Sequence, residues 1–197
     1  MSIVINGDGT VTGLAVGGLP DGTVDAGTLA TDSVVAAKLG TDSVTTDALK
    51  SDAITGADLP AGSVLQVVTS TDSSEMTLAS SSFTDTGMSV AITPISTSSK
   101  ILCFWEVQCF FNTSGGTGIA TQLYRGATGV SGDTYQNDIG KPNSTWGALR
   151  GHWTYLDSPS TTSATTYKVK VKGLNTDPIY VNHNGHKTTL TLMEIVG

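Results

Sequence analysis

The sequence predicts an all-β protein, with an antiparallel β-sandwich or jelly-roll head preceded by an extended, repetitive shaft with short helical turns. Two patterns predict this division. Apolar residues recur at every fifth position up to residue 64, and from residue 65 onward they alternate with polar residues along short runs. The composition agrees, because 38% hydrophobic residues are too many for a disordered chain, and the abundant Ser, Thr and Gly suit β-structure with many turns.

The shaft is predicted from a ten-residue repeat. The blocks DGTVDAGTLA, TDSVVAAKLG, TDSVTTDALK and SDAITGADLP stack in register over residues 21–60. A step of five residues spreads apolar side chains around an α-helix and switches faces on a strand, so neither element would form an apolar stripe. The residues expected to face a common axis are Val24, Leu29, Val34, Leu39, Val44, Leu49, Ile54, Leu59 and Val64.

Two other geometries use a step of five. A square β-helix of the pentapeptide-repeat kind would place Asp32, Asp42, Asp47 and Asp52 in its narrow core, where four unpaired carboxylates are prohibitive. The alternative alternates an extended piece around each Val with a short turn or helical turn ending at each Leu, capped by Ser, Thr or Asp. Each chain then turns one apolar side chain in five toward an axis that it shares with other chains. Three-fold closure is the usual arrangement for such a shaft, and the repeat itself does not count the chains.

The shaft is not expected to fold alone. Burying nine such side chains contributes roughly 15–25 kcal/mol at best. Ordering about 45 residues costs more than that. A globular neighbour must therefore hold the chains together.

The head, residues 65–197, is expected to contain about eight or nine strands and no helix longer than two turns. In 101–109 the odd positions are apolar and should face a core. In 167–172 apolar residues alternate with three lysines, as in a half-exposed strand whose lysines discourage edge pairing. Met193 and Ile195 make the second face of the last run apolar as well. That run is either a central strand or a strand at a subunit interface.

The two cysteines, Cys103 and Cys109, are predicted to be unpaired within the chain. In one strand they would lie about 20 Å apart at roughly 3.3 Å per residue. A disulfide needs Cα atoms within about 7 Å. They are therefore expected to be small buried apolar residues, and a bridge between chains near a symmetry axis is the alternative.

Several function classes are not expected. There is no Gly-x-Ser-x-Gly elbow, phosphate loop or marked pair of carboxylates, so we expect neither an enzyme nor a cofactor. The net charge is -7, and the nine acidic and eight basic residues of 65–197 form no basic stripe for nucleic acid. No apolar run reaches the roughly 18 residues of a membrane span. The start, MSIVINGDGT, has neither the basic residues nor the apolar stretch of a signal peptide.

Histidines mark one candidate metal site. His183 and His186 bracket Asn184-Gly185, a pair that predicts a type I′ hairpin turn. Across such a turn two imidazoles could hold a metal, especially where three copies meet on an axis. With only two ligands and no acidic helper, an exposed turn is the expected alternative.

Aromatic residues mark a candidate ligand surface. Trp146, His152 and Trp153 lie in the segment KPNSTWGALRGHW, beside amide side chains. Exposed aromatic rings next to amides suit stacking on sugar rings. Burial of these aromatic residues in the core is the alternative.

The block pattern TDSVVAAKLGTDSVTTDALKSDAITGADLPAGSVLQVV resembles the stalk of tail fibres of phages that infect cyanobacteria and other marine bacteria. The stretches ITPISTSSKIL, TQLYRG, YLDSPSTTSATTYKVKVK and TLTLMEI resemble the terminal domain of the same fibres. The resemblance implies a homotrimer on the virion surface, made in the host cytoplasm. Residues 1–20 would attach to other phage tail or capsid proteins, 21–64 would form the shaft, and 65–197 would bind a glycan or protein of the host cell surface.

The same features fit a capsid-attached head fibre or decoration protein. A secreted sugar-binding module is a third class, against which the missing signal peptide argues. Tail and capsid attachment share every pattern described above, so both stay open.

The axis assignment can be tested in the shaft. Val44→Asp is expected to lower the first thermal transition by roughly 5 °C or more, because every chain would place a charge at the axis. Thr46→Asp should cause a much smaller shift, because position 46 is expected to face water. Calorimetry on the full chain measures both variants, and equal shifts would show that the inward positions are misassigned.

Overall fold

The computed structural model describes residues 54–111, 118–131, 138–140 and 147–197. Nearer the N-terminus it describes residues 4–5, 7, 11–12, 27, 29–31, 33–35, 37, 39–41, 43–45 and 49. The chain divides into two compact units, Met1–Ala53 and Ile54–Gly197. Residues 54–64 of the predicted shaft are thus grouped with the head. None of the helices in the described ranges has the length and apolar character needed to span a membrane.

The first unit has local structure in its described positions. Strand β1 (Val4–Ile5) pairs antiparallel with β2 (Val11–Thr12). In the repeat region, Ser33 N donates to Ala30 O and Ser43 N donates to Gly40 O, each at 3.1 Å. The same turn recurs in the second unit, where Ser63 N donates to Pro60 O at 3.1 Å. The ten-residue sequence repeat is therefore accompanied by a turn that begins just after Leu29, Leu39 and Leu59.

The apolar residues at every fifth position are exposed in a single chain. Those described, between 36% and 59% exposed, are Leu29, Val34, Leu39, Val44, Leu49, Ile54, Leu59 and Val64. Val24 lies outside the described residues. Their place at an axis between chains stays a prediction.

A short helical turn ends at Leu59, as the repeat predicts. The 3-10 helix η2 (Gly56–Asp58) begins after Thr55, whose backbone N–H and hydroxyl donate to Asp58 Oδ2 at 2.8 Å and 2.7 Å. These bonds, the backbone bond first, lower the pKa of Asp58. Capping by Thr and Asp therefore operates in this copy of the repeat.

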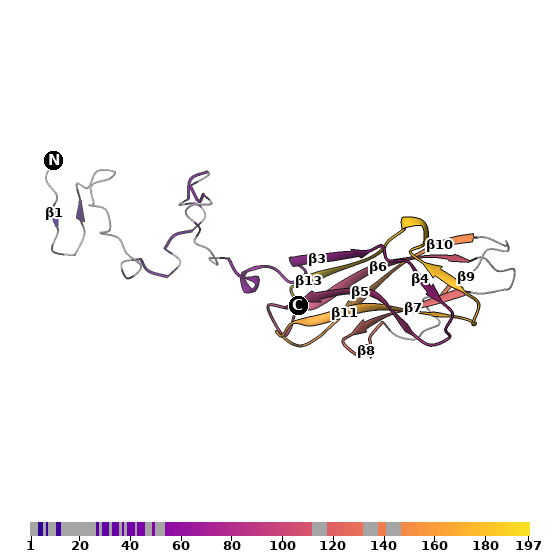
Figure 1. The fold of residues 1–197 in the computed structure, drawn as a ribbon. Coiled ribbons are helices and arrows are strands. Elements are labelled where there is room, and N and C mark those ends of the chain that lie inside the picture. The colour runs from indigo at the N-terminus through magenta and orange to yellow at the C-terminus, as the bar shows by residue number, and fades with distance from the viewer. Residues whose placement is uncertain are drawn as a thin grey trace. The chain divides into compact units, whose positions relative to one another are not determined.

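The second unit is built from two antiparallel sheets that face each other (Figure 1). The β6 sheet consists of β3 (Val64–Asp72), β4 (Met76–Leu78), β6 (Lys100–Phe111), β10 (Gly147–Asp157), β12 (Ile179–Val181) and β13 (Thr188–Ile195). The β7 sheet consists of β5 (Thr84–Ile92), β7 (Gly118–Arg125), β8 (Thr128–Gly129), β9 (Asp138–Gly140) and β11 (Thr165–Gly173).

Several of these strands lie end to end. Strand β10 pairs with β6 along 101–111, so β12 and β13 share the other edge of β6, at 109–111 and 100–106. In the same way β4 and β3 follow β12 and β13, and β8 and β9 share one edge of β7. Eight strand lines result among the described residues, within the predicted range.

The order of these lines identifies the fold. The strand lines are numbered along the chain. In the β6 sheet their order is first (β3 and β4), eighth (β12 and β13), third (β6) and sixth (β10). In the β7 sheet it is second (β5), seventh (β11), fourth (β7) and fifth (β8 and β9). This is the arrangement of a jelly roll, in which hairpin-like pairs of strands are wrapped across two sheets. The predicted fold class is confirmed.

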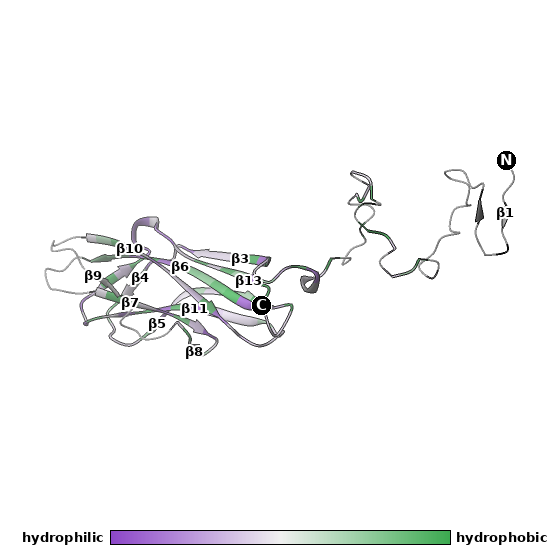
Figure 2. Ribbon diagram, turned by 180° about the vertical axis from the view of Figure 1, so that it is seen from behind, coloured by the Kyte–Doolittle hydropathy of each residue, from purple (hydrophilic) through white to green (hydrophobic). Residues whose placement is uncertain are grey.

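The core lies between the sheets, on the faces predicted from the alternation. All odd positions from Ile101 to Phe111 on β6 are at most 3% exposed, and Tyr167, Val169 and Val171 on β11 are fully buried. Figure 2 shows hydrophobic stretches along the strands of the sandwich. Trp105 Nε1 donates to Thr121 Oγ1 at 3.1 Å, which satisfies its buried N–H across the core.

A polar cluster also joins the sheets. Asp157, at the end of β10, accepts bonds through Oδ2 from Tyr167 OH at 2.6 Å and from Arg125 Nη1 at 2.9 Å. Burial and the bond to Asp157 raise the pKa of Tyr167. Since Asp157 is itself buried, these two donors compensate for its removal from water.

The lysines of β11 do not protect an edge, so that prediction was wrong. β11 lies between β5 and β7, and both of its edges are paired. Lys170 Nζ lies 4.5 Å from the centre of the Tyr124 ring, and Lys172 Nζ lies 5.1 Å from that of Phe83. The alternation of apolar residues and lysines reflects one face in the core and one outer face, on which Lys170 and Lys172 cover aromatic rings.

Strand β13 is a central strand, one of the two alternatives for the last run. It lies between β3 and β6, with Leu190 and Leu192 in the core and Met193 and Ile195 half-buried on the outer face. Glu194, which lies between Met193 and Ile195 in the strand, is fully buried. Its Oε1 accepts a bond from Ile95 N at 2.7 Å, and its Oε2 accepts one from the side chain of Gln66.

Cys103 and Cys109 are free and buried, as predicted. Burial raises the pKa of each thiol from 9.0 to about 12, and for Cys103 the charge of Asp157 adds to this effect. At a pH between about 9 and about 12, the unfolded chain loses thiol protons that the folded chain keeps. The free energy of unfolding should therefore fall as the pH rises above about 9.

This linkage gives a measurable slope. Each thiol should remove up to about 1.4 kcal/mol of stability per pH unit in that window. Urea unfolding of the wild type and of a Cys103→Ala/Cys109→Ala variant, at about pH 8 and about pH 10, isolates the contribution of the thiols. The variant should lose less stability than the wild type, and equal losses would contradict the assignment.

Candidate functional site

The outer face of the β6 sheet contains a shallow hollow where three strands meet. Strand register places Glu106 between His152 on β10 and Thr189 on β13, and Phe104 between Thr154 and Thr191. These even positions of β6 point outward because the odd positions fill the core. The hollow has a volume of about 280 Å³, and the residues that line it are Phe104, Trp105, Glu106, His152, Trp153, Thr154, Thr189 and Thr191.

The Glu106 carboxylate holds two side chains in position at one side of this hollow. Glu106 Oε1 lies 2.8 Å from Arg150 Nε, and Glu106 Oε2 lies 3.5 Å from His152 Nδ1. Arg150 Nη2 also donates to Gln108 Oε1 at 2.7 Å. Arg150 and His152 are well exposed, so these pairs orient the side chains and add little to stability.

The other side of the hollow is apolar and hydroxylated. Phe104 is 37% exposed and is flanked by Thr154 and Thr191 in the register. An exposed ring next to hydroxyl, carboxylate and imidazole groups can take a ligand that has both an apolar face and hydrogen-bonding groups. This arrangement therefore suits binding by ring contact and hydrogen bonds.

The three residues predicted to bind a ligand are placed differently from one another. His152 points outward into the hollow, whereas Trp153 points inward and packs against the core. The Trp153 ring stacks on Trp105, with centroids 6.0 Å apart and an angle of 20°. Trp146 lies outside the described residues. The core alternative thus describes the placement of Trp153, and the binding role of all three stays a prediction.

The Asn-Gly turn is not a hairpin, so that prediction was wrong. Strands β12 and β13 do not pair with each other. They lie end to end along β6, and the residues between them, including the 3-10 helix η4 (His183–Gly185), form an excursion from one strand line. Asn184 and Gly185 do adopt left-handed conformations, with φ of 57° and 77°. With these angles the chain comes back to the same edge of β6 and continues along it, so its direction is not reversed as in a hairpin.

Asn182 holds this excursion in place. It is buried in a left-handed conformation, its N–H donates to Gln108 O at 3.1 Å, and its Nδ2 donates to Ser74 O at 3.2 Å. Its Oδ1 accepts a bond from Thr188 Oγ1 at 2.8 Å. Asn182 thus contacts β6 through its backbone N–H, and its side-chain amide links the β3–β4 connection to the start of β13.

His183 and His186 have separate surroundings. His183 Nδ1 lies 2.7 Å from Glu75 Oε2, and its ring packs against Phe110 and Tyr180 at 5.3 Å and 5.4 Å between centroids. His186 N donates to His183 O at 3.3 Å. Within the described part of the chain, no three His, Cys, Asp or Glu side chains gather in a way that could hold a metal ion.

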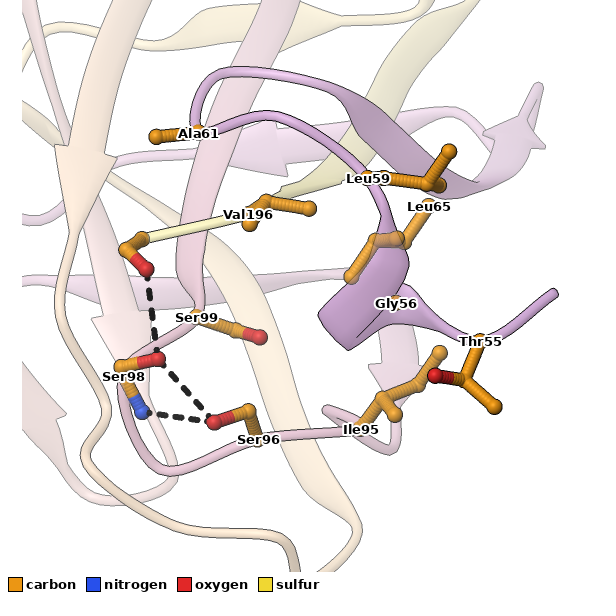
Figure 3. Close-up of a pocket in the computed structure, with 11 residues that line it drawn as sticks. Thr55, Gly56, Leu59, Ala61, Leu65, Ile95, Ser96, Ser98, Ser99 and Val196 are labelled. Carbon is orange, nitrogen blue, oxygen red and sulfur yellow. Dashed lines mark hydrogen bonds between the residues drawn. The ribbon is translucent and has the colours of Figure 1, made fainter. Parts of the chain in front are cut away.

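A second hollow, of about 470 Å³, lies where the chain enters the sandwich (Figure 3). Leu59, Leu65, Ile95 and Val196 form its apolar part. In its polar part Ser98 Oγ lies 3.0 Å from Ser96 Oγ and 3.4 Å from Gly197 O, while the buried Ser99 Oγ has no hydrogen-bond partner among the described residues. No titratable side chain lines this hollow, so it offers apolar contact more than chemistry.

Comparison with known proteins gives limited information. No protein-family model and no curated protein matches the chain. It is similar in structure to a protein of the T13 particle of infectious bursal disease virus, with 16% identity over 67% of this chain and 36% of that chain, and a TM-score of 0.38. It is also similar to a protein of T=1 particles derived from the same virus, with 16% identity over 67% of this chain and 36% of that chain, and a TM-score of 0.37.

A third solved structure, the VP2 subviral particle of that virus, matches at 14% identity over 67% of this chain and 38% of that chain, with a TM-score of 0.29. The chain thus spans little more than a third of the length of these solved chains. At such identities and TM-scores, the likeness establishes neither a family nor a function.

Sequence reasoning missed most of the outward-facing group. Phe104 and Glu106 lie at the outward positions of a strand whose inward positions had been assigned to the core. Arg150 lies in the segment KPNSTWGALRGHW but was not singled out. Their alternation was the available signal. The strand partners that bring these residues together are far apart in sequence, and no local pattern specifies them.

Proposed function

We propose that this chain is a structural virion fibre protein of a bacteriophage, a homotrimeric tail fibre that attaches to the host cell surface. Residues 1–20 would attach it to the particle, the ten-residue repeat would form the shaft, and the jelly roll would be the head that binds a glycan or protein of the host. The proposal rests on the repeat, on its resemblance to fibre stalks, and on the outer face of the β6 sheet.

The observation that carries the proposal is the exposure of the apolar series. From Leu29 to Val64, each described member is 36% to 59% exposed in one chain. A regular series of exposed Val and Leu side chains is costly in water, and other copies of the same repeat are the partners with matching spacing. A shaft of several chains explains both the period and the exposure.

The binding role is supported by the chemistry of the outer face. Residues 65–197 carry nine acids and eight bases, so attraction by net charge is weak. Phe104 with its neighbouring threonines suits contact with a sugar ring. Glu106, Arg150 and His152 supply hydrogen-bonding groups. Three weak sites per fibre and several fibres per particle would give avidity.

Cell binding tests this function. Fluorescently labelled full chain should bind the bacterium to which particles carrying this protein adsorb, with little change between low and moderate salt. Phe104→Ala and His152→Ala should each reduce retention about tenfold, because each removes a contact in the hollow. Leu174→Ala is a matched control, since Leu174 is a large exposed apolar residue outside this hollow.

The outcomes separate the function from the site. If the wild type ignores cells to which the particles adsorb, the attachment function fails. If the wild type binds and the two variants bind equally well, the function stands and the assigned hollow is wrong. Labelling the N-terminus and imaging particles would then show whether the fibre sits on the tail or on the capsid.

A further inference from the structure

The outer face of the β6 sheet also carries an apolar row that no part of the described chain covers. Register places Val67, Met193, Leu102 and Leu156 side by side on β3, β13, β6 and β10. Val67 is 52% exposed and Leu156 is 49% exposed, while the two central members are half-buried. The row thus crosses the whole width of the sheet.

On the side of the row that faces the hollow of about 280 Å³, the neighbouring outward side chains carry no charge. The next outward positions are Thr69, Thr191, Phe104 and Thr154. Thr69 Oγ1 and Thr191 Oγ1 lie 2.9 Å apart and satisfy each other. On the other side the outward positions are Val64, Ile195 and Lys100. Because residues 65–197 carry nine acids and eight bases, copies of the head can approach each other here at low electrostatic cost.

The row lies at the end of the sandwich where the chain enters. Val64 pairs with Ile195, directly beyond the pair of Val67 and Met193, and Val64 is itself 48% exposed. The exposed series of the repeat ends at Leu59 and Val64, and Leu59 lines the hollow of Figure 3. The apolar surface therefore continues from the last residues of the repeat onto the sheet.

We infer that this row is the surface through which the sandwiches of different copies of the chain pack against one another. The inference rests on the trimeric fibre proposed above and names the part of the head that contacts its copies. A broad apolar row on a sheet matches another protein surface better than a small ligand, which needs a concave site. Three such rows around one axis would continue the burial that begins in the repeat.

Replacing one exposed apolar residue of the row by a charged residue tests the inference. Leu156→Glu in the full chain should convert most of the trimer to monomer at micromolar concentration, measured by size-exclusion chromatography with light scattering. Leu174→Glu is the matched control, because Leu174 is 47% exposed and lies outside the row, and it should remain trimeric. Val67→Glu is a second variant on another strand and should act like Leu156→Glu.

Circular dichroism on each variant distinguishes loss of assembly from loss of folding. A folded, monomeric Leu156→Glu protein supports the inference. If Leu156→Glu and Val67→Glu remain trimeric, the row is not the contact, although the fibre function still stands. If the wild type itself is a monomer, the proposed trimeric fibre fails together with this inference, whatever the variants do.

Discussion

The structure of the head depends on one strand, β6, which must bury one face and pair along both edges. Its odd positions fill the core, one edge binds β10 along its length, and the other binds β13 and β12 in succession. The first strand line, β3 and β4, pairs with the other edge of the last one, β13 and β12, so that the first and last lines lie beside each other. The jelly-roll order follows from this arrangement.

The same constraint creates the outer face. Once Ile101, Cys103 and Trp105 are inside, Leu102, Phe104 and Glu106 must point out. Leu102 then joins the apolar row near the end where the chain enters, while Phe104 and Glu106 line the shallow hollow farther along the strand. The proposed contact between copies and the proposed binding site for a host ligand can thus lie on one face without overlapping in their main residues.

Sequence patterns predicted what depends on local alternation and missed what depends on partners. The inward faces of 101–109 and 167–171 were predicted correctly, because period-two burial is visible within a single strand. The excursion at 182–187 was mistaken for a hairpin because Asn-Gly reports left-handed backbone angles and not where the chain goes next. The buried Glu194 was also missed, since its partners Ile95 and Gln66 lie about a hundred or more residues away along the chain.

The central claim is that the ten-residue repeat packs around an axis shared by copies of the chain, and cross-linking tests it most directly. In a Cys103→Ala/Cys109→Ala background, Val44→Cys under mild oxidation should give a covalent dimer on a non-reducing gel, because residues facing one axis approach within about 7 Å. Thr45→Cys, at a neighbouring exposed position, should give much less dimer. Equal cross-linking of the two variants, or none at Val44→Cys, would contradict the claim.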